Sequence, residues 1–316
     1  MPPSPGSLPA PSPSPAQVIR YNGLCNASAA VALDANRFVV ADDNIDTLYT
    51  YAFGQPDPVG QLNLTDYLGN RNKDGVPREA DLEGSARIGD LIYWIGSHGR
   101  NSQGQRKTYR LRFFATPIRD GQVQIPDAPP YTQLLADMLA DANLAALGLA
   151  AASGGLDAPL GPAPEDPDGF NIEGLAESLD GSLMIGFRNP RPGGLAIVLP
   201  LINPAEVVTG QARARFGTPE LLPLQGQGIR SLEWIAGRYF IVAGPYGSTD
   251  PLKTFTLYTW PGPGTAPVPQ SVTFAVPRPE SIFARPGSTA LQVLSDDGDD
   301  CPDPPAFQAT AMTLPG

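Results

Sequence analysis

The sequence of 316 residues predicts an all-β fold, a five-bladed β-propeller, from three observations. It contains 37 prolines and 34 glycines but few apolar stretches with helical spacing, a balance that favours short strands joined by turns. One sequence pattern recurs five times along the chain, and each copy supplies four candidate strands, the number found in a propeller blade. Six blades are the alternative, if the longest gap between copies conceals a degenerate repeat.

The clearest copies of the pattern are DLEGSARIGDLIYWIGSHGR, residues 81–100, and NIEGLAESLDGSLMIGFRNPR, residues 171–191. Both place a glutamate before glycine near the start and a polar cluster near the end. Three weaker copies begin at Asn26, Gly228 and Arg278. Self-similarity of this kind is the signature of a repeat architecture, so each copy is expected to form one blade.

Each copy begins with a short strand, a tight turn and a second, apolar strand. The turns contain glycine, aspartate or asparagine, the residues that tight hairpins require. The first strands are expected at 29–33, 84–88, 174–178, 231–235 and 281–284, and the second strands at 37–41, 91–96, 183–186, 239–243 and 290–294.

A third strand follows in every copy. Several of these strands alternate apolar and polar residues, which suits an outer strand with one buried face. The third strands are expected to begin at Thr47, Thr108, Leu195, Thr254 and Phe307. Fourth strands are expected to begin at Gln17, Gln61, Val123, Glu220 and Gln270.

The gap between the second and third copies holds the one segment with clear helical character, from about Tyr131 to Ala151. We expect a helical insertion over residues 130–152 that lies as a loop over one face of the propeller. Residues 1–16 are rich in proline and serine and have neither the basic start nor the apolar centre of a signal peptide. They are expected to form a flexible tether, and residues 17–316 a single propeller domain.

The net charge of −11 argues against binding to nucleic acid, which requires a basic face. It fits a metal ion, a cationic partner or simple solubility. No run of about eighteen apolar residues occurs, so no transmembrane segment is expected.

The two cysteines, Cys25 and Cys301, lie near opposite ends of the predicted ring. Because the ends of a closed circular fold are neighbours, we expect a disulfide that closes the ring, with two unpaired thiols as the alternative. The disulfide and the tether together predict an extracytoplasmic protein, either periplasmic or secreted.

Equivalent positions of the five copies are expected to form rings around the channel, with the start of each inner strand and the end of the next strand at the same face. One ring contains Ser28, Glu83, Glu173, Arg230 and Glu280. A second contains the polar residues that end the second strands: Asp42, Asp43, Asn44, His98, Arg100, Asn101, Arg188, Asn189, Arg191, Tyr246, Asp296 and Asp297. So many charges at one channel mouth are costly unless they bind a ligand or pair with each other.

This mixture of side chains suits metal-assisted chemistry. Carboxylate and asparagine oxygens form a site for calcium or magnesium, and such an ion polarises a phosphoryl or acyl oxygen and lowers the pKa of a bound water. The expected metal ligands are Glu83, Glu173, Glu280, Asp42 and Asp296, and the candidate catalytic residues are Glu83, Glu173 and His98. Arginine binds phosphate or carboxylate through paired hydrogen bonds, so the expected substrate-binding residues are Arg100, Arg188, Arg191, Arg230, Asn101 and Asn189.

Each of these residues also has an interpretation without a ligand. Polar side chains at strand ends often only solvate the mouth or pair between blades, and the glycine after each glutamate also fits a close approach of inner strands. A lone histidine such as His98 is more often hydrogen-bonded within a loop than catalytic. The stretch DDGDDCPD, residues 296–303, is equally typical of a calcium loop and of a solvated acidic turn.

The copies at 81–101 and 169–191, together with GIRSLEW at 228–234, resemble a bacterial family of propellers of unknown function. In motif that family is similar to the phytase-like esterase propellers. The resemblance covers most of the chain from Gln17 onward, and it implies a propeller fold and hydrolysis of a phosphoester or another ester. A weaker similarity to lactonase-type propellers implies a divalent ion held in the central tunnel by an acidic residue that precedes glycine.

Two functions follow from these patterns. The first is a phytase-like, metal-assisted hydrolase of an anionic ester. The alternative is a non-catalytic module that binds a small anionic ligand or a protein partner at the same mouth. The chain lacks the G-x-S-x-G, Walker, C-x-x-C and H-E-x-x-H patterns, and a single histidine excludes a histidine-rich zinc or copper site.

Overall fold

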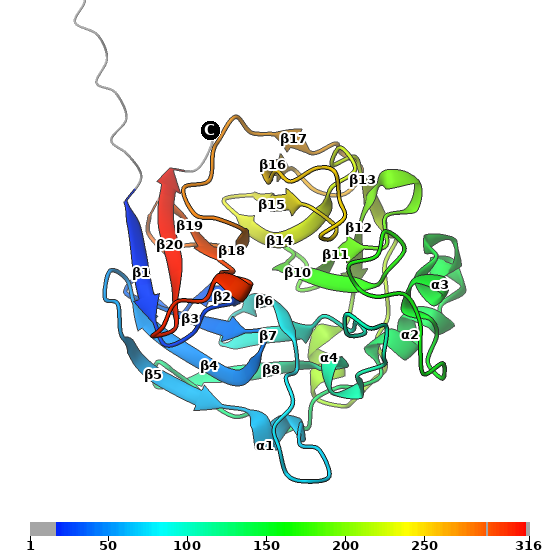
Figure 1. The fold of residues 1–316 in the computed structure, drawn as a ribbon, viewed down its shortest axis with the longest axis horizontal. Helices are drawn as coiled ribbons and strands as arrows, with labels where there is room; N and C mark the ends of the chain where they lie inside the picture. The colour runs from blue at the N-terminus through cyan, green and yellow to red at the C-terminus, as the bar shows by residue number, and fades with distance from the viewer. Residues whose placement is uncertain (1–16, 289, 314–316) are drawn as a thin grey trace, which may run out of the picture.

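Five four-stranded antiparallel sheets surround a central axis in the computed structural model, which describes residues 17–288 and 290–313 (Figure 1). Each sheet is one blade of a β-propeller, so the predicted fold class and blade number are confirmed. The inner strands, nearest the axis, are β2 (Ala27–Ala32), β6 (Leu82–Ile88), β10 (Asn171–Glu177), β14 (Gly228–Ile235) and β18 (Pro279–Ala284).

Three further strands follow outward in each blade. The second strands are β3 (Arg37–Asp42), β7 (Leu91–Gly96), β11 (Leu183–Asn189), β15 (Arg238–Gly244) and β19 (Ala290–Ser295). The third strands are β4 (Ile45–Ala52), β8 (Phe113–Arg119), β12 (Ala196–Leu201), β16 (Thr256–Trp260) and β20 (Ala306–Thr313). The fourth strands are β5 (Pro58–Asn63), β9 (Gln122–Val123), β13 (Glu220–Leu222), β17 (Val268–Pro269) and, out of chain order, β1 (Val18–Asn22).

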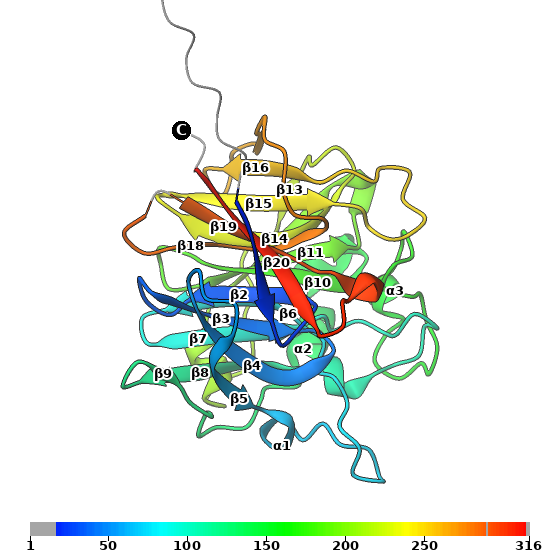
Figure 2. The same ribbon diagram turned by 60° about the vertical axis from the view of Figure 1, so that its left-hand side comes forward.

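The ring is closed by pairing of its two ends. Strand β1 pairs with β20, from Val18 opposite Thr310 to Asn22 opposite Ala306, and completes the fifth blade (Figure 2). A disulfide joins Cys25 to Cys301 with their Cα atoms 5.6 Å apart. The expected disulfide is therefore present, and it links the two sides of the closure.

Burial falls from the axis outward. All six residues of β2 are buried, whereas no residue of β5 is. An apolar cluster lies between each pair of neighbouring blades, such as the one in which Val39 of the first blade packs with Trp94 and Phe114 of the second. Burial of a large apolar side chain contributes about 1.5–3 kcal/mol, so these clusters hold the blades in fixed positions around the channel.

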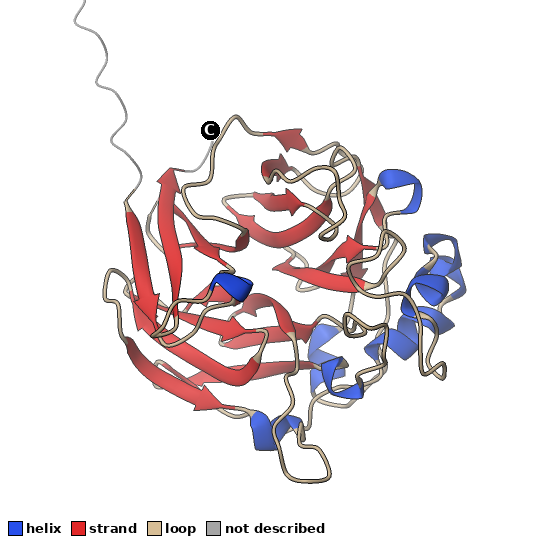
Figure 3. Ribbon diagram, in the orientation of Figure 1, coloured by secondary structure: helices blue, strands red, loops and turns tan. Residues whose placement is uncertain are grey.

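The insertion differs from the single helix that its sequence predicts. It forms α2 (Leu134–Ala140), a 3-10 segment η2 (Ala142–Leu147) and α3 (Leu149–Ser153). The side chain of Asp141 accepts a hydrogen bond from the backbone of Asn143 and starts a new turn, and Gly148 has a left-handed φ of 73° that ends it. The helices lie at the outer edge of the ring, and their apolar side chains join the core between the second and third blades rather than only covering one face (Figure 3).

The remaining helical elements are short. They are α1 (Thr65–Leu68), α4 (Pro204–Val208) and the 3-10 turns η1 (Thr108–Arg110), η3 (Pro192–Gly194) and η4 (Gly298–Asp300). Within the described part of the chain, no helix has both the length and the apolar character needed to span a membrane. The tether expected at residues 1–16 lies outside the described residues.

Three predicted strands are displaced. The fourth strand of the first blade begins at Pro58 rather than Gln61. The third strand of the second blade begins at Phe113 rather than Thr108, because the intervening residues form η1 and the side chain of Arg112 is tied to the carbonyl oxygen of Leu68 at 3.1 Å. The fourth strand of the fourth blade is Val268–Pro269 rather than a strand from Gln270. The apolar residues after Gln270 pack between the fourth and fifth blades instead of pairing as a strand.

Candidate functional site

A one-residue bulge interrupts the pairing of every inner strand near its start. The register shifts lie between Ala27 and Ala29, Leu82 and Gly84, Ile172 and Gly174, Ile229 and Ser231, and Pro279 and Ser281. The residues left without a cross-strand partner are therefore Ser28, Glu83, Glu173, Arg230 and Glu280. These five are the first ring that the repeats predict, and bulges often re-aim a side chain towards a site in this way.

A cavity of about 710 Å³ opens at the mouth formed by this ring. Its lining includes every ring member except Ser28, whose hydroxyl donates to the carbonyl oxygens of Leu82 and Ala41. Below the ring, the inner strands leave a space of only about 10 Å³, which is room for about one water molecule. The cavity is therefore a basin with a closed floor.

Arginines and glutamates pair on the side of the third, fourth and fifth blades. Arg188 Nη1 lies 2.7 Å from Glu173 Oε1, and Arg230 Nε lies 3.0 Å from Glu173 Oε2. Arg230 also forms an ion pair with Glu280, and Asn171 donates to Glu173 at 2.7 Å. Burial opposes the charge of Arg188, but the neighbouring Glu173 outweighs it, so the pKa of Arg188 lies above its ordinary value.

Carboxylates gather on the side of the first and second blades. Oxygens of Asp43, Asp81 and Glu83 all lie within 4.8 Å of one another, a spacing that fits a shared metal ion. Asp43 follows β3, Asp81 precedes β6, and Glu83 is the bulge residue of β6. We call these three residues the carboxylate triad.

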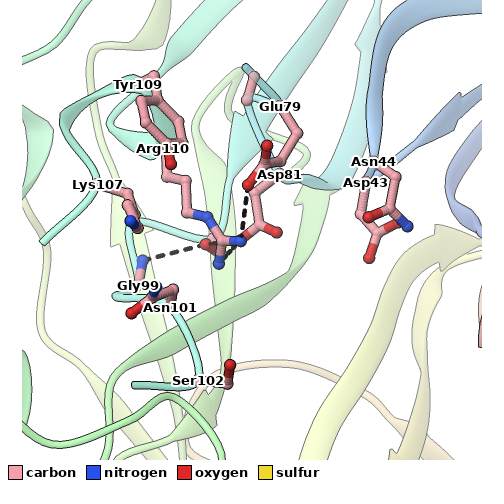
Figure 4. Close-up of polar contacts among 12 residues, drawn as sticks. Asp43, Asn44, Glu79, Asp81, Gly99, Asn101, Ser102, Lys107, Tyr109 and Arg110 are labelled. Atoms are coloured by element: carbon pink, nitrogen blue, oxygen red, sulfur yellow. Dashed lines mark hydrogen bonds and ion pairs between the residues drawn. The ribbon is translucent and has the colours of Figure 1, made fainter. Parts of the chain in front are cut away.

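Each member of the carboxylate triad has a different set of partners. Asp81 pairs with Arg110 at 2.9 Å and accepts a hydrogen bond from Ser97. Figure 4 shows Arg110 directed at Asp81 and Glu79, with Asp43 facing them from the neighbouring blade. Asp43 accepts from the side chains of Asn26 at 2.9 Å and Asn44 at 2.8 Å.

Glu83 makes neither a hydrogen bond nor an ion pair with another residue that the structure describes. Burial, together with the negative charges of Glu173 and Asp81, raises the pKa of Glu83 well above its ordinary value. Burial and the charges of Asp81 and Asp296 do the same to the pKa of Asp43. A cation bound between these carboxylates would replace their protons.

The charges of the cavity leave a negative surplus. Seven acidic and five basic side chains line it. When all of them are ionised, the surplus equals the charge of one divalent ion. The triad offers only oxygen donors, which suit calcium or magnesium, so the residues present fit the expected metal.

The cavity also receives the other sequence candidates Asn101 and Asp296. The side chain of Asn101 is occupied by its own loop, where Oδ1 accepts from the backbone of Gln105 at 2.8 Å. Asp296 Oδ1 accepts from the backbone of Gly298 at 2.8 Å. Asp42 does not line the cavity, because its carboxylate accepts from the backbone of Cys25, Asn26 and Asn44.

His98 lies outside the cavity lining. It is 3% exposed, has a left-handed φ of 54°, and its Nδ1 lies 2.8 Å from the carbonyl oxygen of Gly96. Burial lowers the pKa of His98 to about 4. The imidazole is therefore neutral at pH 7, and it does not reach the cavity.

Three other candidates for substrate binding also lie outside the cavity lining. Arg100 donates to backbone carbonyl oxygens at the end of α3 and just after it, with Nε 2.7 Å from that of Ser153. Arg191 donates to the carbonyl oxygen of Gly226 and lies over the ring of Tyr246, 4.1 Å from its centroid. Asn189 is fully buried and donates to the carbonyl oxygens of Pro164 and Tyr246. These side chains hold the loops around the mouth.

Five charged residues that line the cavity were not among the sequence candidates: Asp81, Arg110, Glu165, Lys253 and Arg278. Asp43 was expected in the second ring, and the structure makes it a candidate metal ligand as well. A signal for two of the five charged residues was present. The residues two positions before the ring are Asn26, Asp81, Asn171, Gly228 and Arg278. Four of these five are polar, and three of them, Asp81, Asn171 and Arg278, line the cavity.

A family model described as "Protein of unknown function (DUF3616)" matches residues 135–282, which span the insertion, the third and fourth blades and the start of the fifth. No curated protein matches the chain.

Several solved structures resemble the whole ring. Glutaminyl cyclase of Myxococcus xanthus is 13% identical with a TM-score of 0.46, over 95% of this chain and 97% of that one. A putative oxidoreductase (glucose dehydrogenase) of Thermus thermophilus is 14% identical with a TM-score of 0.48, over 94% and 100%. The PQQ-bound aldose sugar dehydrogenase of Streptomyces coelicolor is 11% identical with a TM-score of 0.45, over 94% and 99%. Likenesses this distant transfer no activity, and a relationship to phytase-like propellers is not shown.

Proposed function

We propose that the protein is a metal-assisted hydrolase of a small anionic ester, in the manner of the phytase-like propellers. One divalent ion, calcium or magnesium, is held by the carboxylate triad of Asp43, Asp81 and Glu83. The observation that carries this proposal is the spacing of the triad, with oxygens within 4.8 Å of one another, beside arginines that line the same cavity. When bound, the ion would polarise the ester and lower the pKa of a water molecule.

The three triad residues have distinct roles in this proposal. Glu83 is the ligand free to turn towards the ion, because it has no other partner among the described residues. Asp81 is held in place by Arg110 and Ser97, and Asp43 by Asn26 and Asn44. Two fixed carboxylates and one adjustable one provide part of the coordination shell and leave the remaining positions for water and substrate.

The anionic group of the substrate is bound on the opposite side of the cavity. Arg188 Nη2 lies 3.7 Å from Glu165 Oε1, beyond hydrogen-bond distance, so this donor remains available. Lys253 is exposed at the rim. Glu173 fixes the other side of Arg188 and the guanidinium of Arg230, so the donor of Arg188 that faces the cavity is held in a fixed position for a phosphate or carboxylate.

We also propose that the protein works outside the cytoplasm. The disulfide between Cys25 and Cys301 is the supporting observation, because structural disulfides persist in oxidising compartments.

Calorimetric titration with calcium chloride and magnesium chloride tests the ion site, with the protein first treated with a chelator. Glu83→Gln keeps the size of the side chain and removes its charge, so we expect cation affinity to fall roughly tenfold or more. Glu165→Gln is the matched control, because it removes one charge from the same cavity but outside the triad. Its effect is expected to stay within about threefold. Equal effects of the two substitutions would mean that only the general field of the cavity attracts the ion.

Hydrolysis is tested with a panel of phosphomonoesters, phosphodiesters and lactones, each with and without the ion. The proposal expects turnover of at least one anionic ester by the wild type with the ion, and none by Glu83→Gln. Binding of the ion without turnover of any panel member would favour a second function, a non-catalytic module for a small anionic ligand or a protein partner. The observation behind that alternative is that Arg230 already pairs with both Glu173 and Glu280.

A further inference from the structure

The side chain of Asn26 lies between the carboxylate triad and the closure of the ring. Its Nδ2 donates to Asp43 Oδ1 at 2.9 Å, and its Oδ1 accepts from the backbone N–H of Gly298 at 2.9 Å. Asn26 is 7% exposed. The two contacts fix the orientation of the amide, so a ligand-bearing turn of the first blade is tied directly to the last turn of the fifth.

The backbone beside Asn26 is held by the same two turns. The N–H groups of Cys25 and Asn26 both donate to Asp42 Oδ2, at 3.3 Å and 3.1 Å. The N–H of Asp297 donates to the carbonyl oxygen of Cys25 at 3.2 Å. The segment of Cys25 and Asn26 therefore bridges the end of β3, where Asp43 begins, and the turn that leads into η4.

The disulfide fastens this bridge. Cys25 is the residue before Asn26, and Cys301 is the residue after η4, where its N–H donates to the carbonyl oxygen of Gly298. Cys301 is exposed, so a small reductant can reach the bond. Asp81, in contrast, is fixed from within the second blade by Arg110 and Ser97, without any contribution from the closure.

We propose that Asn26 is a positioning residue for the cation site and that the Cys25–Cys301 disulfide keeps it in place, so that opening the disulfide weakens cation binding. This inference rests on the proposed function, because Asp43 matters here as a ligand. A dithiol such as dithiothreitol donates two electrons and two protons, the S–S bond breaks, two S–H groups form, and the dithiol becomes a cyclic disulfide. Asp43 then loses the donor that the closure fixes and keeps only that of the exposed neighbour Asn44, while Asp81 and Glu83 remain in place.

Residues that orient a metal ligand without touching the ion change affinity by about 10- to 100-fold. We therefore expect the calcium dissociation constant to rise roughly tenfold when Asn26 is replaced by alanine with the disulfide intact. A similar rise is expected after reduction of the wild type and in the variant Cys25→Ser/Cys301→Ser. Calcium chloride is the probe, titrated by calorimetry into the full chain after chelator treatment.

A control separates positioning from loss of stability. Phe307→Leu removes an aromatic ring that stacks on Tyr21 in the same closure, with ring centroids 5.3 Å apart, and this apolar side chain cannot form a hydrogen bond with Asn26 or with the carboxylate triad. This variant is expected to melt at a lower temperature than the wild type and to bind calcium within about twofold of it. If Phe307→Leu weakened calcium binding as much as Asn26→Ala does, the effect would be one of stability and the inference would fail.

The remaining outcomes separate the inference from the function on which it rests. If the oxidised wild type binds calcium and neither Asn26→Ala nor reduction changes the affinity, the inference is overturned and the proposed ion site stands. If the oxidised wild type binds no calcium, the ion site and the inference both fall. Should the double cysteine variant not fold, Asn26→Ala and the reduced wild type still decide the question.

Discussion

His98 occupies a position equivalent to Asp43 and Arg188, each fifteen residues after a ring residue. Its imidazole turns back to the carbonyl oxygen of Gly96 instead of towards the cavity. Glu173 therefore meets an arginine in its own blade, while Glu83 meets no cation at the corresponding place. Because the imidazole of His98 points away from the cavity, Glu83 has no counterpart of Arg188 and is left for a ligand, whereas Glu173 is paired.

Burial of His98 makes the stability of the folded protein depend on pH. The pKa of His98 is lowered from 6.5 to about 4 by desolvation, so the unfolded chain binds a proton more readily than the folded one. The stability that His98 contributes is complete above pH 6.5 and is lost as the pH falls towards 4. We expect the wild type to lose on the order of 3 kcal/mol more unfolding free energy between pH 7 and pH 4 than His98→Asn does.

Asparagine is the suitable replacement because it tolerates the left-handed φ of 54° at this position and retains a donor for Gly96. Urea unfolding of both proteins at several pH values measures the difference, and other titrating groups cancel in the comparison. If the unfolding free energy of the two proteins changes with pH in the same way, protonation of His98 is not linked to unfolding and the prediction is wrong.

The positions of the ring residues were predictable, but their partners were not. The repeats place Glu83 and Glu173 at equivalent positions, and the bulges show why both reach the channel. Pairing depends on which side chain each loop turns inward, and a repeat pattern does not contain that information. Asp81 is the one neighbour of Glu83 that the sequence could have indicated, because it lies two positions earlier, at the start of the same strand.

At the scale of single elements, the inner strands approach each other so closely that glycine is required after Glu83 and Glu173. A Cβ atom on Gly84 would lie 2.9 Å from Ile95 Cγ2 and 3.1 Å from the backbone nitrogen of Leu175 in the next blade. The expectation that this glycine serves close packing therefore agrees with the geometry, and it does not compete with a role for Glu83. The bulge directs Glu83 to the cavity, while Gly84 allows the neighbouring blade to approach.

Gly84→Ala tests that close approach. We expect the unfolding free energy to fall by about 1–3 kcal/mol, because the added methyl group must displace backbone of another blade. Gly60→Ala in the exposed strand β5 is the control, since its Cβ would lie 3.7 Å from that of Thr50, an ordinary contact distance. Denaturant unfolding measures both, and equal stability of the two variants would mean that the inner strands can move apart at little cost.

The elements that departed from prediction did so where local polar contacts or long-range packing prevail over the apolar pattern. The insertion has a helical pattern throughout, but the side chain of Asp141 and the left-handed Gly148 divide it. The alternation after Gln270 resembles a strand, yet it fills a gap between blades. In both cases the sequence correctly predicts which residues are buried. The secondary structure depends on hydrogen bonds and packing contacts that an apolar pattern does not specify.

Over the whole molecule, the closure of the ring connects stability and the candidate site. Strand β1 completes the fifth blade, and the disulfide joins positions 276 residues apart. The repeats and the cysteine positions predicted that the ends meet, because a ring of blades has no other way to bury its terminal inter-blade faces. The contact between Asn26 and Asp43 at this closure was beyond prediction, because it depends on side-chain orientation.

Reduction of the disulfide is therefore expected to destabilise the entire ring. A cross-link over so long a loop restricts the unfolded chain strongly, and its loss costs about 2–5 kcal/mol. Urea unfolding monitored by the fluorescence of the buried Trp94 and Trp260 should show a lower midpoint after treatment with dithiothreitol. The variant Cys25→Ser/Cys301→Ser should start at that lower midpoint and be unaffected by the reductant. An unchanged midpoint in the reduced wild type would show that pairing of β1 with β20 holds the ring closed without the disulfide, and any loss of calcium binding on reduction would then be a local effect on the site.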